Sequence, residues 1–254
     1  MGRRSQVVIS TKFGYLGNEA TKTLQGYNVS PAYIERACEA SLKRLQTDYI
    51  DLYLLHVWEI ALSEIEPVID TLEKLVKQGK IRSYGWSTDL QIGAKIFAEQ
   101  PNCVAIQQQL NVLTGNEALL NMCESKGLAS INRSPLAMGL LSGKYTKDSL
   151  VTKNDVRGAG HFWAEDSFIN GKPNPEALNK LNAIREILTS NGRTLVQGSL
   201  AWIWGKSGVT IPIPGFKTVQ QIEENAKAMD FGPLTPEQMK EIDDILGYNT
   251  DSQV

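Results

Sequence analysis

Short runs of β-branched and aliphatic residues alternate with segments of helical periodicity along nearly the whole chain, and this alternation limits the fold more than any other feature. Apolar strands that are separated by helices are typical of a parallel sheet covered by helices. The sequence therefore predicts an α/β fold with six strands, at residues 7–12, 49–55, 81–86, 103–106, 128–132 and 209–213.

Cap residues and apolar spacing predict the helices between these strands. Ser30 and Pro31 form a helix start, Ser63 and Glu66 fit a capping box, and Gly79 follows the last periodic residue of the second helix. We expect helices at residues 31–45, 63–79, 90–98, 117–125, 175–190, 194–205, 218–229 and 235–246, with a loop-rich stretch between 134 and 175.

The turn after the first predicted strand argues against a doubly wound nucleotide-binding sheet. Lys12-Phe13-Gly14-Tyr15-Leu16-Gly17 stands where such a fold needs a G-x-G-x-x-G motif. The strand spacing instead favours the (β/α)8 TIM-barrel class, here as an incomplete barrel with about six parallel strands. No linker or low-complexity segment interrupts the chain, so we expect one domain over residues 1–254.

Composition narrows the class of protein. Lys+Arg number 26 and Asp+Glu 28, a net charge of −2, which does not suit a nucleic-acid partner. The sequence shows no membrane-spanning apolar run or signal peptide, and we expect no membrane partner and a cytoplasmic location. Three unclustered cysteines and two histidines predict neither disulfides nor a metal site. The sequence leaves the oligomeric state open.

Polar residues stand at the ends of the predicted strands, where (β/α) barrels place their chemistry. Lys12 would supply a partly buried ammonium or an amine nucleophile, and His56 a donor to a carbonyl oxygen. Ser87, Gln107 and residues 132–134 follow other strands in the same way. The helix that begins near Thr218 would offer free backbone amides to an anion, beside the charge of Lys217.

Several longer motifs resemble the aldo-keto reductase family, in the bacterial group close to potassium-channel β-subunits and general stress reductases. They occur in the order and spacing of that family and together cover most of the chain. The motifs are VVISTKFG (7–14), SLKRLQTDYIDLYLLH (41–56), KQGKIRSYGWS (77–87), RSPLAMGLLSGKY (133–145) and TIPIPGFKTVQQIEEN (210–225).

The resemblance implies an NADP(H)-dependent oxidoreductase that reduces small aldehydes or ketones by hydride transfer. By position, Lys12 and His56 match catalytic residues of the family. Gln221 stands where the family often has Arg, which leaves NAD(H) open as the cofactor. The matching cofactor-binding residues are Ser87, Gln107, Arg133, Ser134, Leu136, Ala137, Gly139, Ser142, Lys144, Gly215, Lys217, Gln221, Glu224 and Asn225.

One family motif has no counterpart in the sequence. The D-T-A-x-x-Y-G segment, which supplies the family's catalytic Asp and Tyr, does not occur, and it should precede Val7. We therefore expect the first two strand–helix units to be missing, and carbonyl reduction to be weak or inactive. Tyr15 is a poor replacement for the acid, because proton donation requires hydrogen-bond reach to the substrate oxygen.

Two other functions stay open, and so does the role of one long loop. The chain could be a non-catalytic NADP-binding sensor or scaffold module, or a lyase that forms a Schiff base on Lys12. Residues 145–175 contain His161, Phe162, Trp163 and Phe168 among glycines. This stretch could form an aromatic lid over the site or a surface loop with a small core of its own.

Overall fold

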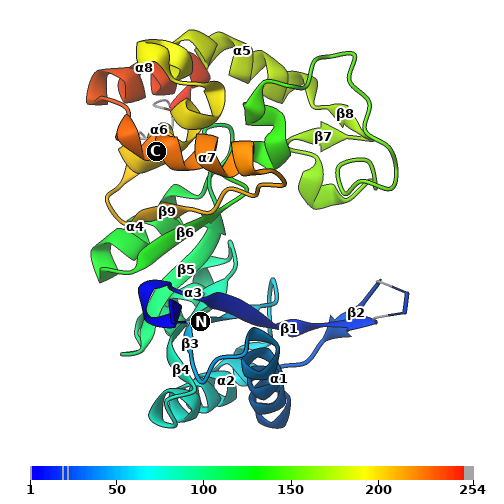
Figure 1. Cartoon of the computed structure of the whole chain (residues 1–254), viewed down its shortest axis with the longest axis vertical. Coiled ribbons are helices and arrows are strands. Elements are labelled where there is room, and N and C mark those ends of the chain that lie inside the picture. The colour runs from blue at the N-terminus through cyan, green and yellow to red at the C-terminus, as the bar shows by residue number, and fades with distance from the viewer. Residues whose placement is uncertain (1, 19, 22, 249–254) are drawn as a thin grey trace. The chain divides into compact units, whose positions relative to one another are not determined.

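The computed structural model describes residues 2–18, 20–21 and 23–248, which fall into two compact units (Figure 1). The first unit comprises residues up to Gln108 together with Glu117–Ser130, and the second comprises Gln109–Asn116 and the residues from Ile131 onward. A single domain over 1–254 stays a prediction.

The elements alternate as the sequence predicts. The strands are β1 (Ser10–Asn18), β2 (Thr23–Tyr27), β3 (Ile50–His56), β4 (Ile81–Ser87), β5 (Cys103–Gln109), β6 (Ala129–Arg133), β7 (Phe168–Ile169), β8 (Lys172–Pro173) and β9 (Thr210–Pro212). The α-helices are α1 (Pro31–Leu45), α2 (Leu62–Lys77), α3 (Gln91–Ala98), α4 (Glu117–Lys126), α5 (Pro175–Thr189), α6 (Leu195–Lys206), α7 (Val219–Lys227) and α8 (Pro236–Leu246).

The strands form a sheet in the order β2-β1-β3-β4-β5-β6-β9, in which β6 begins in the first unit and ends in the second. In the first unit β1, β3, β4 and β5 run parallel, with Lys12 opposite Leu54 and Leu54 opposite Gly85. All six predicted strands have a counterpart. Two additions were not predicted: β2, which pairs antiparallel with β1, and the short hairpin of β7 and β8.

The first strand starts later than its apolar run suggests. Val7 and Val8 are 50% and 80% exposed, and β1 begins at Ser10. Polar contacts explain this, because the Asp51 carboxylate accepts a hydrogen bond from the Ile9 N–H at 3.0 Å. Arg4 donates to the Val7 carbonyl oxygen at 3.1 Å. Residues 7–9 are therefore tied down through their backbone and not by burial of their side chains.

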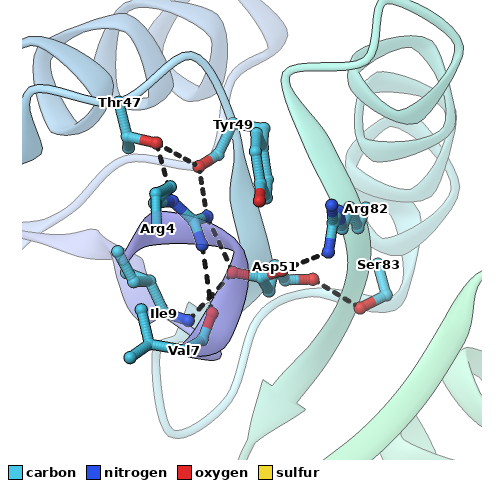
Figure 2. Close-up of polar contacts among 8 residues, drawn as sticks. All are labelled: Arg4, Val7, Ile9, Thr47, Tyr49, Asp51, Arg82 and Ser83. Atoms are coloured by element: carbon cyan, nitrogen blue, oxygen red, sulfur yellow. Dashed lines mark hydrogen bonds and ion pairs between the residues drawn. The ribbon is translucent and has the colours of Figure 1, made fainter. Parts of the chain in front are cut away.

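Figure 2 shows the cluster that anchors this segment to β3. Asp51 forms ion pairs with Arg4 (2.7 Å) and Arg82 (2.9 Å), and its own side chain is only 8% exposed. The guanidinium carbons of Arg4 and Arg82 lie 3.8 Å and 4.1 Å from the centre of the Tyr49 ring, within cation–π range. The cluster joins the N-terminal segment, β3 and β4 within one unit.

The helices of the first unit cover a core of aromatic and aliphatic side chains. Phe13 stacks on Tyr53 with ring centroids 4.7 Å apart, and Trp86 packs against Phe97 at 5.0 Å. The capping box expected from Ser63 and Glu66 is wrong. Helix α2 begins at Leu62, and the Glu64 carboxylate accepts from the Ala61 N–H at 3.0 Å, because a side chain three residues after the cap reaches back to it.

In the second unit α5, α7 and α8 pack against α6, and α6 contacts β9. The Ile213 N–H donates to the Asn132 carbonyl oxygen at 3.1 Å, which places the residue after β9 beside β6. Val196, Leu200 and Ala228 form a buried cluster against which Leu136 and Trp204 pack. Gly198 is required for close helix packing, because a Cβ there would lie 2.0 Å from the Leu188 carbonyl oxygen.

The long loop of the second unit is ordered by a hairpin. Asn170 and Gly171 both have positive φ, 51° and 80°, which is the Asn-Gly turn that favours a two-residue hairpin between β7 and β8. The Val151 N–H donates to the Gly171 carbonyl oxygen at 2.8 Å and closes the loop. Phe168 is buried, whereas Trp163 is exposed and stacks on His161 at 4.9 Å.

Two further properties concern only residues 2–18, 20–21 and 23–248. None of the helices described there is long and apolar enough to cross a membrane. Within the same residues, no group of three or more His, Cys, Asp or Glu side chains could hold a metal ion.

Candidate active site

Lys12 and His56 lie on neighbouring parallel strands of the first unit. Lys12 faces Leu54 of β3, and His56 ends β3 opposite Gly14 of β1. Both residues keep solvent-exposed surface, and a partly buried ammonium at Lys12 stays a prediction. Nearby protein atoms nevertheless desolvate the ammonium enough to lower its pKa. The two groups together could bind and polarise a carbonyl oxygen.

Tyr15 lies against His56. The two rings meet edge to face with centroids 5.5 Å apart, and the Tyr15 hydroxyl accepts a hydrogen bond from the Trp58 N–H at 3.2 Å. Tyr15 thus packs against the candidate histidine.

Ser87 and Gln107 meet at the ends of β4 and β5. The Ser87 Oγ donates to the Gln107 Oε1 at 3.3 Å, and both side chains are buried. Thr88 is turned away from this pair, since its hydroxyl donates to the Trp58 carbonyl oxygen at 2.9 Å and accepts from the Leu90 N–H at 3.0 Å. The structure brings the predicted Ser–Gln pair together, and Thr88 bonds only to nearby backbone groups in the contacts described above.

A pocket of about 760 Å³ opens in the second unit. Its walls come from the segment after β6, the first part of the long loop, and the segment from β9 into α7. The lining residues are Ser134, Pro135, Leu136, Met138, Gly139, Ser142, Lys144, Asn154, Asp155, Val156, Arg157, Val196, Ile213, Gly215, Phe216, Lys217, Gln221, Glu224 and Asn225.

The pocket gathers most of the predicted cofactor-binding residues of this unit. Two of them lie elsewhere. Ala137 is buried behind the wall, and the Arg133 guanidinium donates to the Gln109 Oε1 at 2.9 Å. Neither is among the lining residues of this pocket. The ten that do line it are Ser134, Leu136, Gly139, Ser142, Lys144, Gly215, Lys217, Gln221, Glu224 and Asn225.

The wall after β6 has an unusual backbone. Ser134, Ala137 and Met138 all adopt left-handed φ angles, 53°, 46° and 55°, although they carry side chains. Gly139 continues the same conformation with φ 93°. Each such non-glycine residue costs on the order of 1–3 kcal/mol, and this strain persists only where the surroundings hold it. Such strained segments cluster at binding sites.

The start of α7 differs from the expected anion site. The Gln221 Oε1 accepts from the backbone N–H of Lys217 at 2.7 Å and of Thr218 at 3.3 Å. The Thr218 hydroxyl in turn accepts from the Gln221 N–H at 3.2 Å. Gln221 and Thr218 thus form a capping box, and these contacts occupy three of the amides expected to be free. The Lys217 amide is thus occupied, and Lys217 lines the pocket as a positively charged residue.

The charges in the pocket include two residues that sequence reasoning missed. Asp155 and Arg157 pair at 2.6 Å, and hydrogen bonds from Arg157 hold the pKa of Asp155 well below its usual range. The charge of Lys217 acts in the same direction. Only the spacing of an acid and an arginine two residues apart, in a loop rich in glycine, could have indicated them.

The donor set suits a ligand that carries phosphate and a polar ring. Lys144 and Lys217 supply cations, and the Asn225 Nδ2 is buried with no hydrogen-bond partner among the described residues. A buried donor of this kind stabilises the structure only when an acceptor is supplied.

Comparison with known proteins identifies the same family that the sequence motifs resemble. The family model described as "Aldo/keto reductase family" matches residues 1–247. Aldo-keto reductase yakc, NADP(+), of Schizosaccharomyces pombe is 32% identical over 233 residues, which are 90% of this chain and 66% of that protein. The chain therefore spans about two thirds of the length of this relative.

Two solved structures share the fold. Glycerol dehydrogenase AKR11B4 from Gluconobacter oxydans is 26% identical with a TM-score of 0.81, over 98% of this chain and 75% of that one. An aldo-keto reductase from Klebsiella pneumoniae in complex with NADPH is 25% identical with a TM-score of 0.68, over 97% of this chain and 72% of that one.

None of these matches bears out the predicted loss of two strand–helix units, which stays a prediction. The fold itself is the α/β fold of the (β/α)8-barrel class. The match of a family model to nearly the whole sequence shows that this chain belongs to the aldo/keto reductase family.

Proposed function

We propose that this chain binds NADP(H) in the pocket of its second unit and reduces small aldehydes or ketones, with weak turnover. The observation that carries the proposal is that ten residues predicted from the motifs after β6 and β9 line this one pocket. The NADPH complex of the Klebsiella pneumoniae relative supports the identity of the ligand. Lys144, Lys217 and Asn225 would hold it through charge and hydrogen bonding.

The bound nicotinamide would supply the hydride to a carbonyl carbon. Lys12 and His56 would bind the carbonyl oxygen and stabilise the negative charge that develops on it. Ser87 and Gln107 form a hydrogen-bonded pair within the first unit, and the motif resemblance assigns this pair to the carboxamide of the nicotinamide. Since the sequence contains no D-T-A-x-x-Y-G motif, the family's Tyr acid and its Asp have no counterpart. General acid catalysis typically contributes about 10²–10⁴-fold, so turnover should be slow.

The test combines binding with turnover. Titration with NADPH, followed by fluorescence, should show saturable binding, and a reactive aromatic aldehyde should be reduced slowly, as measured by loss of NADPH absorbance. His56→Asn should lower this rate further and leave NADPH binding nearly unchanged, because we assign His56 to the carbonyl oxygen of the substrate and not to the nucleotide. Absence of NADPH binding would overturn the proposal. Tight binding with no turnover would favour a sensor or scaffold module.

A further inference from the structure

Arg157 connects two segments of the pocket wall, the long loop and the turn after β6. Its Nε and one Nη donate to the Asp155 carboxylate at 2.7 Å and 2.6 Å, a bidentate pair. The other Nη donates to the Met138 carbonyl oxygen at 3.3 Å and to the Tyr145 hydroxyl. The guanidinium is largely buried, with 14% of the side chain exposed. We call Arg157, Asp155, Tyr145 and the Met138 carbonyl the Arg157 clasp.

The loop side of the Arg157 clasp is held in place before any ligand binds. The Arg157 backbone N–H donates to the Asp155 Oδ1 at 3.0 Å, and the Asp155 N–H donates to the Thr152 carbonyl oxygen at 3.0 Å. Both carboxylate oxygens face the guanidinium, and each of its three nitrogens already donates. Protein acceptors therefore take most of the five N–H groups of Arg157.

The other side of the Arg157 clasp is the strained backbone. Met138 adopts φ 55° and ψ 23°, a conformation that costs a non-glycine residue on the order of 1–3 kcal/mol, and it is this residue's carbonyl that Arg157 holds. Tyr145 is braced by an edge-to-face contact with Phe168 at 4.9 Å. The clasp thus joins the strained turn to the packed loop, and both line the pocket.

We propose that Arg157 and Asp155 are positioning residues, which set the shape of the pocket by holding the left-handed turn at 137–139 rather than by contacting the ligand. This inference rests on the proposed function, since the dinucleotide is the ligand whose binding would depend on that wall. It makes an unusual prediction about charge. Removing the carboxylate of Asp155 should weaken the binding of an anion, although it removes a negative charge from the pocket.

The experiment measures NADPH affinity for four variants of the full chain at one ionic strength. Asp155→Asn and Arg157→Gln should each raise the Kd about tenfold or more. Arg157→Lys should raise it nearly as much, because a lysine cannot reproduce the planar fork that pairs with a carboxylate. Asp148→Asn, an exposed acid of the same loop, is the matched charge control and should leave the Kd unchanged. An equal or tighter Kd for Asp155→Asn would overturn the proposal.

Hydrogen exchange gives a readout that needs no ligand. In Asp155→Asn and Arg157→Gln, the backbone amides of residues 134–144 should exchange faster than in the wild type, while those of α5 should not change. Unchanged exchange at 134–144 would contradict a positioning role. If the wild type binds no NADPH, the proposed function fails, and this exchange measurement alone decides the role of the Arg157 clasp.

Discussion

Single side chains in the pocket differ in whether they are available to a ligand. The side-chain Oε1 of Gln221 caps α7, and Arg157 donates hydrogen bonds to Asp155, Tyr145 and the Met138 carbonyl oxygen. Lys217 differs, since it lines the pocket and influences Asp155 only through charge. Among these residues we therefore propose Lys217 as the partner of the ligand's phosphate, as the motif resemblance suggested.

Lys217→Ala should weaken NADPH binding about tenfold and NADH binding by less than about threefold. The physical reason is that a hydrogen bond or ion pair to a charged group contributes about 1.5–3 kcal/mol, and only NADPH carries the additional phosphate. Fluorescence titrations with both nucleotides measure the difference. Lys227→Ala, at the other end of α7, is the control for net charge. Equal weakening of both nucleotides would show that Lys217 does not recognise the additional phosphate.

At the scale of elements, polar contacts decide where the first strand begins. The sequence pattern places a strand at residues 7–12, but the Asp51 carboxylate and Arg4 bind the backbone of residues 7–9 and leave Val7 and Val8 exposed. The Asp51 contact joins residues 42 positions apart, so local periodicity cannot reveal it. Strand β2 was missed for a related reason, because all its residues are exposed and show no alternation of burial.

Asp51→Asn should destabilise the first unit by about 2 kcal/mol and make its free energy of unfolding less dependent on pH at low pH. Burial alone would raise the pKa of Asp51, but the hydrogen bond from Ile9 and the charges of Arg4 and Arg82 together lower it. A carboxyl whose pKa is lower in the folded state stabilises the protein above its unfolded pKa, about 3.9. This contribution is lost as the pH falls below about 4 towards the folded pKa.

Urea unfolding followed by circular dichroism between about pH 2.5 and 7 measures the effect of Asp51→Asn. The wild type should lose stability below about pH 4 more steeply than the variant. Asp70→Asn changes an exposed acid on α2 and should follow the wild type at every pH. If the free energy of unfolding falls equally below pH 4 in the wild type and in Asp51→Asn, the assigned role of the carboxylate is contradicted.

At the scale of the whole molecule, the two units share strands. The chain passes between them at β5 and β6, since Gln109 belongs to the second unit and Ala129–Ser130 to the first. Breaking either unit therefore disrupts a strand of the other. We expect the units to unfold together, so that a ligand bound in the second unit stabilises the first.

Thiol labelling can report this coupling. Cys38, Cys103 and Cys123 all lie in the first unit, and burial raises their pKa values to about 11, 12 and 11. They should react with a thiol reagent only when this unit opens. NADPH at a hundred times its Kd should slow labelling about a hundredfold if the units open together. Labelling that is insensitive to bound NADPH would show that the units open independently.

By itself, the sequence determined the kind and order of the main helices and strands, because apolar periodicity and cap residues act over a few positions. Its motifs also indicated ten residues that the structure gathers in one pocket. Only the tertiary structure decided how individual polar groups are paired. Gln221 caps α7, Asp51 holds the start of β1, and Arg157 holds the turn at Met138. Each of these groups has several possible hydrogen-bond partners, and which one it takes depends on the residues that folding brings close to it. A local sequence pattern does not contain that information.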